Sequence, residues 1–132
     1  MKKFSLVLVL GAMAWVLPCG SADAIPLFNM KFQERYAGEK ANPDFAKLVK
    51  ETAKCNVCHV EGEKKSVRNE FGEALHDAGL DKKNYPKERV ESEADAVNKE
   101  IQAAFDKVEA KKSAGGMTFG DLIKAGKLPG AK

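Results

Sequence analysis

The stretch from Cys55 to His59, with the sequence CNVCH, constrains this chain more than any other feature. It places two cysteines and one of the chain's two histidines within five positions. A disulfide across only two intervening residues would close a very short loop and would add little stability to a fold. The pair therefore performs redox chemistry or holds a bound group, and the surrounding fold has to serve that role.

The first 24 residues have the order of a secretory signal peptide. Lys2 and Lys3 give a positive start, residues 4–17 are mostly apolar, and Ala22-Asp23-Ala24 supplies small residues at a cleavage site. We therefore predict cleavage after Ala24 and export to the periplasm. The apolar run is too short for a comfortable membrane span, although an uncleaved anchor remains an alternative.

A lipoprotein attached through Cys19 is a further alternative for this segment. It is less favoured, because Pro18 stands where a lipoprotein signal requires a small residue. Export implies an oxidising compartment, where a small domain often depends on disulfides. After cleavage, Cys55 and Cys58 would be the remaining cysteines.

The mature chain would span residues 25–132, which is the length of one small domain. Without Lys2, Lys3 and Asp23 it carries 20 basic and 18 acidic side chains, a net charge of +2. The two signs are interspersed, so we expect a solvated surface and no nucleic-acid partner. We expect no membrane span in the mature chain, and the oligomeric state stays open.

Helical periodicity dominates the mature chain, and no alternating strand pattern of useful length occurs. Asn42 and Pro43 suit the start of a helix that runs directly into Cys55. Three further helices are predicted over residues 67–78, 86–112 and 119–125, the first ended by Gly79 and the last by Gly126. Residues 25–41 have no clear period and are predicted as an arm or a short helix. The fold class is therefore all-α.

Two chemistries that use Cys-x-x-Cys fit this chain poorly. A thioredoxin-like dithiol sits where a strand meets the start of a helix, whereas this pair lies at a helix end. A structural zinc ion needs four ligands, so Cys55, Cys58, His59 and His76 would all have to serve. Cys58 and His59 are adjacent in the chain and make awkward partners on one tetrahedral ion.

The third chemistry is the covalent attachment of haem c, whose signature is Cys-x-x-Cys-His. Two thioether bonds must reach two vinyl groups on one edge of the porphyrin, and this geometry explains the spacing. The imidazole of the following residue is then held beneath the ring, where it can bind iron. The sequence predicts one covalently attached haem c, with Cys55 and Cys58 as attachment points and His59 as a metal ligand.

The segment FAKLVKETAKCNVCHV resembles the N-terminal helix and haem motif of small monohaem cytochromes c of class I. Phe45, ten residues before the first cysteine, and Lys54 carry this likeness, which is specific over Asn42–Val60. It implies a cytochrome c-like fold of three to four helices around one haem, with His59 as the proximal ligand. The family's Gly-Pro-x-Leu stretch is missing here, so the hydrogen-bond partner of the His59 ring stays open.

The sixth iron ligand decides between an electron carrier and a ligand binder. We predict Met117, because GGMTFG is a glycine-rich approach that resembles the Met-x-Phe segment of class I cytochromes. His76 is an alternative ligand, although the apolar stripe of its helix points away from it. Met30 is the third and least favoured candidate.

The leading hypothesis is a periplasmic carrier that passes single electrons to redox partner proteins met transiently. One alternative is a haem protein that binds a gas such as nitric oxide at an open or displaceable sixth position. A second alternative is a haem subunit of a larger oxidoreductase. We predict no enzyme, because no set of nucleophile, base and oxyanion donor is evident. Basic residues that flank the expected haem edge are read as solvated surface with a weak steering effect: Lys54, Lys64, Lys65, Arg68, Lys82 and Lys83.

Overall fold

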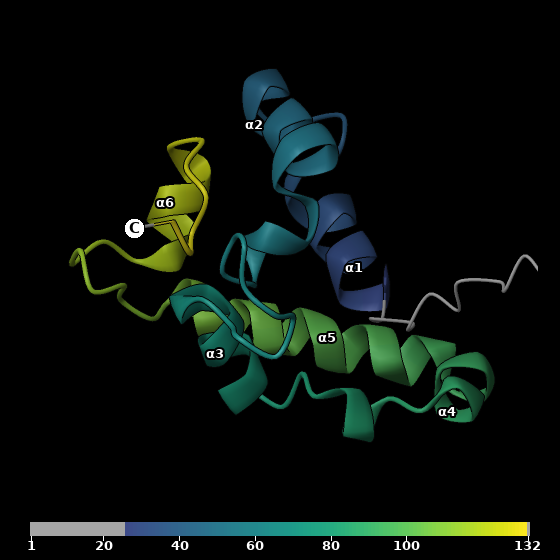
Figure 1. The fold of residues 1–132 in the computed structure, drawn as a ribbon. Helices are drawn as coiled ribbons and strands as arrows, with labels where there is room; N and C mark the ends of the chain where they lie inside the picture. Colours follow the sequence, from purple (N-terminus) through teal and green to yellow (C-terminus); the bar gives the residue numbers. More distant parts are fainter. Residues whose placement is uncertain (1–25, 132) are drawn as a thin grey trace, which may run out of the picture.

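The computed structural model describes residues 26–131, and within this range the regular secondary structure is helical (Figure 1). The described residues form no strand, and their only β-type pairings are isolated bridges at His59–Arg68 and Lys112–Thr118. The all-α prediction is therefore confirmed for this range. The predicted signal peptide and Cys19 lie outside the described residues. Among the helices described, none has the length and apolarity needed to cross a membrane.

The segment before the motif is helical, as predicted, and consists of α2 (Pro43–Lys47) and the π-helical η1 (Leu48–Ala53). The backbone leaves the helical region at Lys54, and the 3₁₀-helical η2 (Lys54–Val57) continues into the motif. Asn42 caps the start of α2, because its Oδ1 accepts from the backbone N–H of Asp44 at 2.9 Å and of Phe45 at 3.3 Å. Phe45 and Val49 are buried and anchor this segment to the core.

The helix after the motif is shorter than predicted. α3 covers Glu70–Asp77, whereas the apolar pattern suggested residues 67–78. Val67 is 40% exposed and lies before the helix, where its carbonyl pairs with the N–H of Val60. Gly79 ends the segment with a positive φ of 101°, a conformation that glycine adopts without strain. A short turn, η3 (Lys82–Asn84), follows.

The predicted single helix over residues 86–112 is wrong, because the chain breaks it into α4 (Lys87–Ser92) and α5 (Ala94–Glu109). Glu93 leaves the helical region with φ −123° and ψ 37°. The break lets α4 turn back on α5, so that Arg89 reaches Glu100 at 2.6 Å. Eleven positions along an unbroken helix would span about 16 Å, too far for that ion pair.

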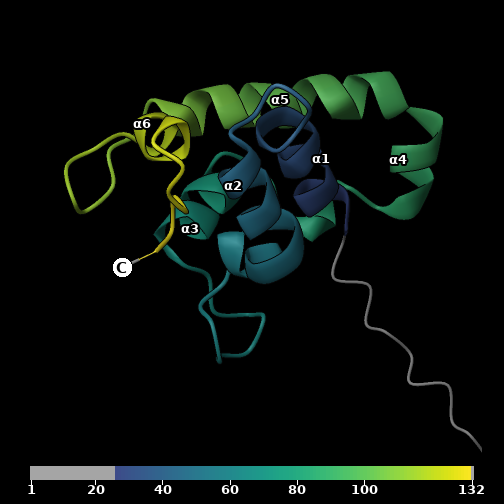
Figure 2. The same cartoon turned by 90° about the horizontal axis from the view of Figure 1, so that it is seen from above.

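The last helix follows the prediction closely. α6 covers Phe119–Lys124, and Thr118 Oγ1 accepts from the N–H of Asp121 at 3.1 Å. Gly126, with φ 72°, follows its end. In both views α5 runs along one side of the molecule, with α4 at one end and α6 at the other (Figure 2). The helices outnumber the three to four predicted, because α1 forms and the long helix is divided.

The helix α1 (Pro26–Tyr36) joins the core through aromatic side chains. The Phe32 ring meets Phe71 of α3 at 5.8 Å and Phe105 of α5 at 6.2 Å between centroids. Phe71 in turn meets Phe119 of α6 at 5.3 Å. All four rings are fully buried. These edge-to-face contacts tie four helices into one core.

A polar contact also ties α1 to α5. The Arg35 guanidinium donates to Gln102 at 2.8 Å, to Asp106 at 2.6 Å and to Glu109 at 2.8 Å. The Tyr36 hydroxyl also donates to Glu109. Burial, followed by the Glu109 carboxylate, raises the pKa of Tyr36 far above its ordinary value, so this hydroxyl remains a donor. The two helices are therefore held by directional bonds as well as by apolar packing.

Candidate cofactor-binding site

Both motif cysteines and His59 line one cavity of about 320 Å³. One wall comes from α1, through Phe28 and Asn29, and another from α3 and the turn after it, through Leu75 and Leu80. These walls are mainly apolar, as expected for a site that takes a large organic group. The full lining is Phe28, Asn29, Lys54, Cys55, Cys58, His59, Lys65, Arg68, Gly72, Leu75, Leu80 and Lys82.

The backbone is distorted immediately before the motif. The π-helical turn η1 ends at Ala53, and Lys54 has a positive φ of 43°. A side chain other than glycine rarely adopts that conformation, and such strain gathers at functional sites. Cys55 is exposed, whereas Cys58 is half-buried, and both are free thiols. The distortion therefore falls where the chain presents its two cysteines to the cavity.

The Cys58 thiol is not activated for redox exchange. Burial, with a smaller contribution from Cys55, raises its pKa to about 12. A thiol with that pKa is protonated at neutral pH and is a poor nucleophile.

Asn69 joins the motif to the start of α3. Its Nδ2 donates to the carbonyl oxygens of Asn56 at 3.1 Å and Val57 at 3.0 Å. Its Oδ1 accepts from the N–H of Gly72 at 2.9 Å, which caps the helix. Its own backbone N–H donates to the Cys58 carbonyl at 3.0 Å. One buried amide thus fixes both the motif backbone and the helix that follows it.

Gly72 lets α3 lie directly against the motif. A Cβ placed on Gly72 would lie only 2.0 Å from the carbonyl oxygen of Cys58. Gly130, near the end of the described chain, covers Asn69 as closely, since its Cβ would lie 2.2 Å from the Asn69 Cγ. Because both positions are glycine, the backbone of α3 can lie against Cys58 and the backbone near Gly130 can lie against Asn69.

The cavity lining is positively charged. It carries Lys54, Lys65, Arg68 and Lys82, and no Asp or Glu occurs among the described residues that line it. Arg68 also lies 3.8 Å from Glu73, outside the lining. A partly apolar cavity with a cationic rim suits an organic group that bears carboxylates.

Two residues that line the cavity each carry one buried polar atom without a hydrogen-bond partner among residues 26–131. The atoms are Nδ1 of His59 and Oδ1 of Asn29. Buried polar groups are nearly always paired, so these two atoms are exceptions in the described part of the chain. The hydrogen-bond partner of the His59 ring, which the sequence left open, is not found among these residues.

The three candidates for the sixth ligand all lie outside the cavity lining. Met117 is 41% exposed, on the connection between α5 and α6, which projects from one end of the molecule in Figures 1 and 2. Its carbonyl is held by the N–H and Oγ of Ser113 at 2.8 and 2.9 Å. Met30 is 46% exposed. Ligation by Met117 stays a prediction, and the structure does not bring this side chain to the cysteines.

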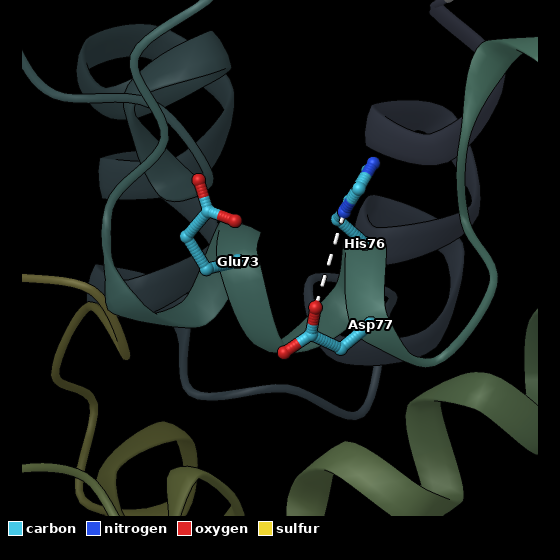
Figure 3. Close-up of side chains that lie close together, drawn as sticks. All are labelled: Glu73, His76 and Asp77. Carbon is cyan, nitrogen blue, oxygen red and sulfur yellow. Dashed lines mark ion pairs between the residues drawn. The ribbon is translucent and has the colours of Figure 1, made fainter.

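His76 belongs to a different cluster. It lies with Glu73 and Asp77 in the last turns of α3, and their possible ligand atoms are within 4.8 Å of one another (Figure 3). Its Nε2 is 3.2 Å from Asp81 Oδ2 and its Nδ1 is 4.0 Å from Asp77. Exposed acidic groups beside a histidine are common on protein surfaces, so we assign no metal here. The zinc set that combines His76 with the cysteines is not assembled.

The sequence singled out the cysteines and His59, but it did not predict how Asn69, Gly72 and Asn29 lie around them. Asn69 and Gly72 had a visible signal, an N-cap residue three positions before a glycine in a predicted helix. Asn29 had none, because its segment shows no period. Comparisons with protein-family models, with curated proteins and with solved structures gave no match.

Proposed function

We propose that this protein is an exported monohaem protein of the c type that carries single electrons. The observation that carries the proposal is the convergence of Cys55, Cys58 and His59 on one cavity. The cationic rim and apolar walls of the cavity fit the carboxylates and the ring of a haem. When bound, the haem iron would take up and release one electron.

The residues of this chain have separate roles in the proposal. Cys55 and Cys58 would hold the group covalently, and the imidazole of His59 would bind its iron. Asn69 and Gly72 hold the motif backbone against α3, so the attachment points stay fixed relative to the cavity. A carrier benefits from such rigidity, because little rearrangement then accompanies a change of charge. No enzyme activity is proposed.

The second candidate is a haem protein that binds a small ligand at an open sixth position. The observation that favours it is the make-up of the cavity, whose described lining residues include no thioether and no imidazole except that of His59. For Met117 to bind iron, the 112–118 connection would have to move to the cavity. A haem subunit of a larger oxidoreductase has no comparable observation in its favour.

The test is spectroscopic and uses the full chain expressed with the machinery for c-type attachment. We expect a redox titration of the haem that is fully reversible and has the slope of a one-electron transfer. A near-infrared band of the ferric protein that disappears in Met117→Ala would assign the sixth ligand and favour the carrier. A high-spin spectrum that changes on addition of carbon monoxide would favour the ligand binder. Purified protein with no haem spectrum would contradict both.

A further inference from the structure

Arg68 lies opposite His59 across the short antiparallel bridge that follows the motif. Two backbone hydrogen bonds flank this pair, one at 3.0 Å from the N–H of Asn69 to the Cys58 carbonyl and one at 3.2 Å from the N–H of Val60 to the Val67 carbonyl. His59 and Arg68 are therefore a non-hydrogen-bonded pair, whose side chains project to the same side with Cβ atoms about 5 Å apart. Both residues line the cavity, so the fold sets the Arg68 side chain next to that of His59 at the cavity wall.

The positive charge of Arg68 is only weakly compensated. Its ion pair with Glu73 is long, at 3.8 Å, which is beyond hydrogen-bond distance. The Glu73 side chain is 54% exposed and that of Arg68 is 33% exposed, so water screens the acid more than the base. No Asp or Glu occurs among the described residues that line the cavity. The cavity wall beside His59 thus carries a positive charge that is partly shielded from water.

We propose that Arg68 raises the reduction potential of the bound haem, as a fixed positive charge beside the His59 ligand. The inference rests on the proposed function and adds a residue that tunes it. A positive charge near a redox centre stabilises the state that holds the extra electron, most strongly where little water intervenes. The step is the passage of one electron from a donor to the iron, with no bond made or broken. Arg68 acts through its charge and is not a ligand.

The size of the effect follows from Coulomb's law. At an effective dielectric constant of about 20, a unit charge on the order of 10 Å away shifts such an equilibrium about tenfold. Partial exposure of Arg68 and the opposite charge of Glu73 reduce this effect. We expect Arg68→Gln to lower the ratio of reduced to oxidised protein about three- to tenfold at a fixed applied potential. Arg68→Lys keeps the charge and should stay within about twofold of the wild type, and Glu73→Gln should raise the ratio.

The experiment is a redox titration of the full chain with its attached haem, followed by the absorption of the haem at one ionic strength. The matched control is Lys99→Gln, which removes the same charge from an exposed residue of α5 that lies outside the cavity lining. We expect this control to change the ratio less than about twofold, because solvent screens a distant surface charge. The spectra of both oxidation states report whether each variant keeps its iron ligands, and thermal unfolding reports its stability.

An unchanged ratio in Arg68→Gln would overturn the inference. An equal fall in Arg68→Lys would also overturn it, because the effect would then come from packing, and an equal fall in Lys99→Gln would assign the effect to net charge alone. If Arg68→Gln does not fold, Glu73→Gln decides the question, and a ratio that does not rise refutes the inference. Each of these results leaves haem attachment standing, whereas wild-type protein without haem would refute the proposed function itself, so the two failures are distinguishable.

Discussion

The substitution Gly72→Ala tests how closely the motif is packed against α3. In a helix, alanine normally stabilises relative to glycine by about 1 kcal/mol. Here the new Cβ would lie 2.0 Å from the Cys58 oxygen and 2.9 Å from its carbonyl carbon, both of them backbone atoms. Ordinary van der Waals contact begins near 3.4 Å, so α3 and the motif would have to separate by about 1.4 Å.

A separation of that size would break bonds that now join the two segments. The Asn69 backbone N–H donates to the Cys58 carbonyl at 3.0 Å, and the Asn69 Nδ2 donates to the Val57 carbonyl, also at 3.0 Å. Two lost hydrogen bonds at about 1 kcal/mol each, together with strained packing, lower the free energy of unfolding by about 3 kcal/mol or more. The unfolding temperature of a domain of this size should fall by at least about 10 °C.

The assay is urea and thermal unfolding of the full chain, followed by circular dichroism. The matched control is Gly115→Ala, where the new Cβ meets only the Ser113 Oγ, at 3.7 Å, so we expect a change below about 0.5 kcal/mol. If Gly72→Ala is as stable as the wild type, or more stable, the close approach of α3 to the motif is refuted.

Three further substitutions test the polar contacts. Asn69→Asp keeps the helix cap but sets a carboxylate against the motif carbonyls, so it should destabilise the fold by about 2–4 kcal/mol in urea unfolding; an effect below about 0.5 kcal/mol would contradict this role. Tyr36→Phe removes the hydroxyl bond to Glu109 and should cost about 1 kcal/mol, and an equal cost in a Glu109→Ala background, which lacks the acceptor, would argue against the bond. The Lys83 backbone N–H, followed by the His76 side chain, holds the pKa of Asp81 below its ordinary value. That stabilisation is present above the unfolded-state pKa and is lost as the pH falls through the lower folded value. Asp81→Asn should therefore lower the unfolding temperature at neutral pH but not in strong acid, and a deficit independent of pH would contradict the assignment.

Local signals in the sequence predicted several helix ends correctly. Asn42 and Thr118 are cap residues whose side chains bond the backbone two or three positions on, so their effect is confined to one turn. Gly79 and Gly126 likewise follow helix ends with positive φ. The cysteine and histidine spacing also identified the residues that meet in the cavity, because the chemistry of the motif fixes that spacing locally.

The features that the sequence did not predict depend on contacts between distant segments. α1 has no amphipathic period, and its place is set by Phe32 and Arg35 against α5, some seventy positions away in the chain. The break at Glu93 is accompanied by a contact across it, in which Arg89 reaches Glu100. A strong helical period predicts that helix forms, but it does not show where tertiary contacts divide it.

In the cavity, too, the sequence predicted residues that are close together in the chain and did not predict those brought in from distant segments. Cys55, Cys58 and His59 were recognised together, whereas Asn29 enters from a helix 26 positions before the first cysteine. The close approach at Gly72 likewise needs the motif and α3 to be brought together, and no single segment encodes it. Met117 had the right chemistry and a plausible spacing, but its side chain lies outside the cavity lining.

The most direct test of the central claim is the intact mass of the purified full chain after complete denaturation, following expression with the c-type attachment machinery. The account predicts a mass greater than that of the processed polypeptide by one haem, retained under denaturing conditions. The increase should be lost when Cys55 and Cys58 are both replaced by alanine. A wild-type mass that corresponds to the polypeptide alone, with both thiols free to react with an alkylating reagent, would contradict it.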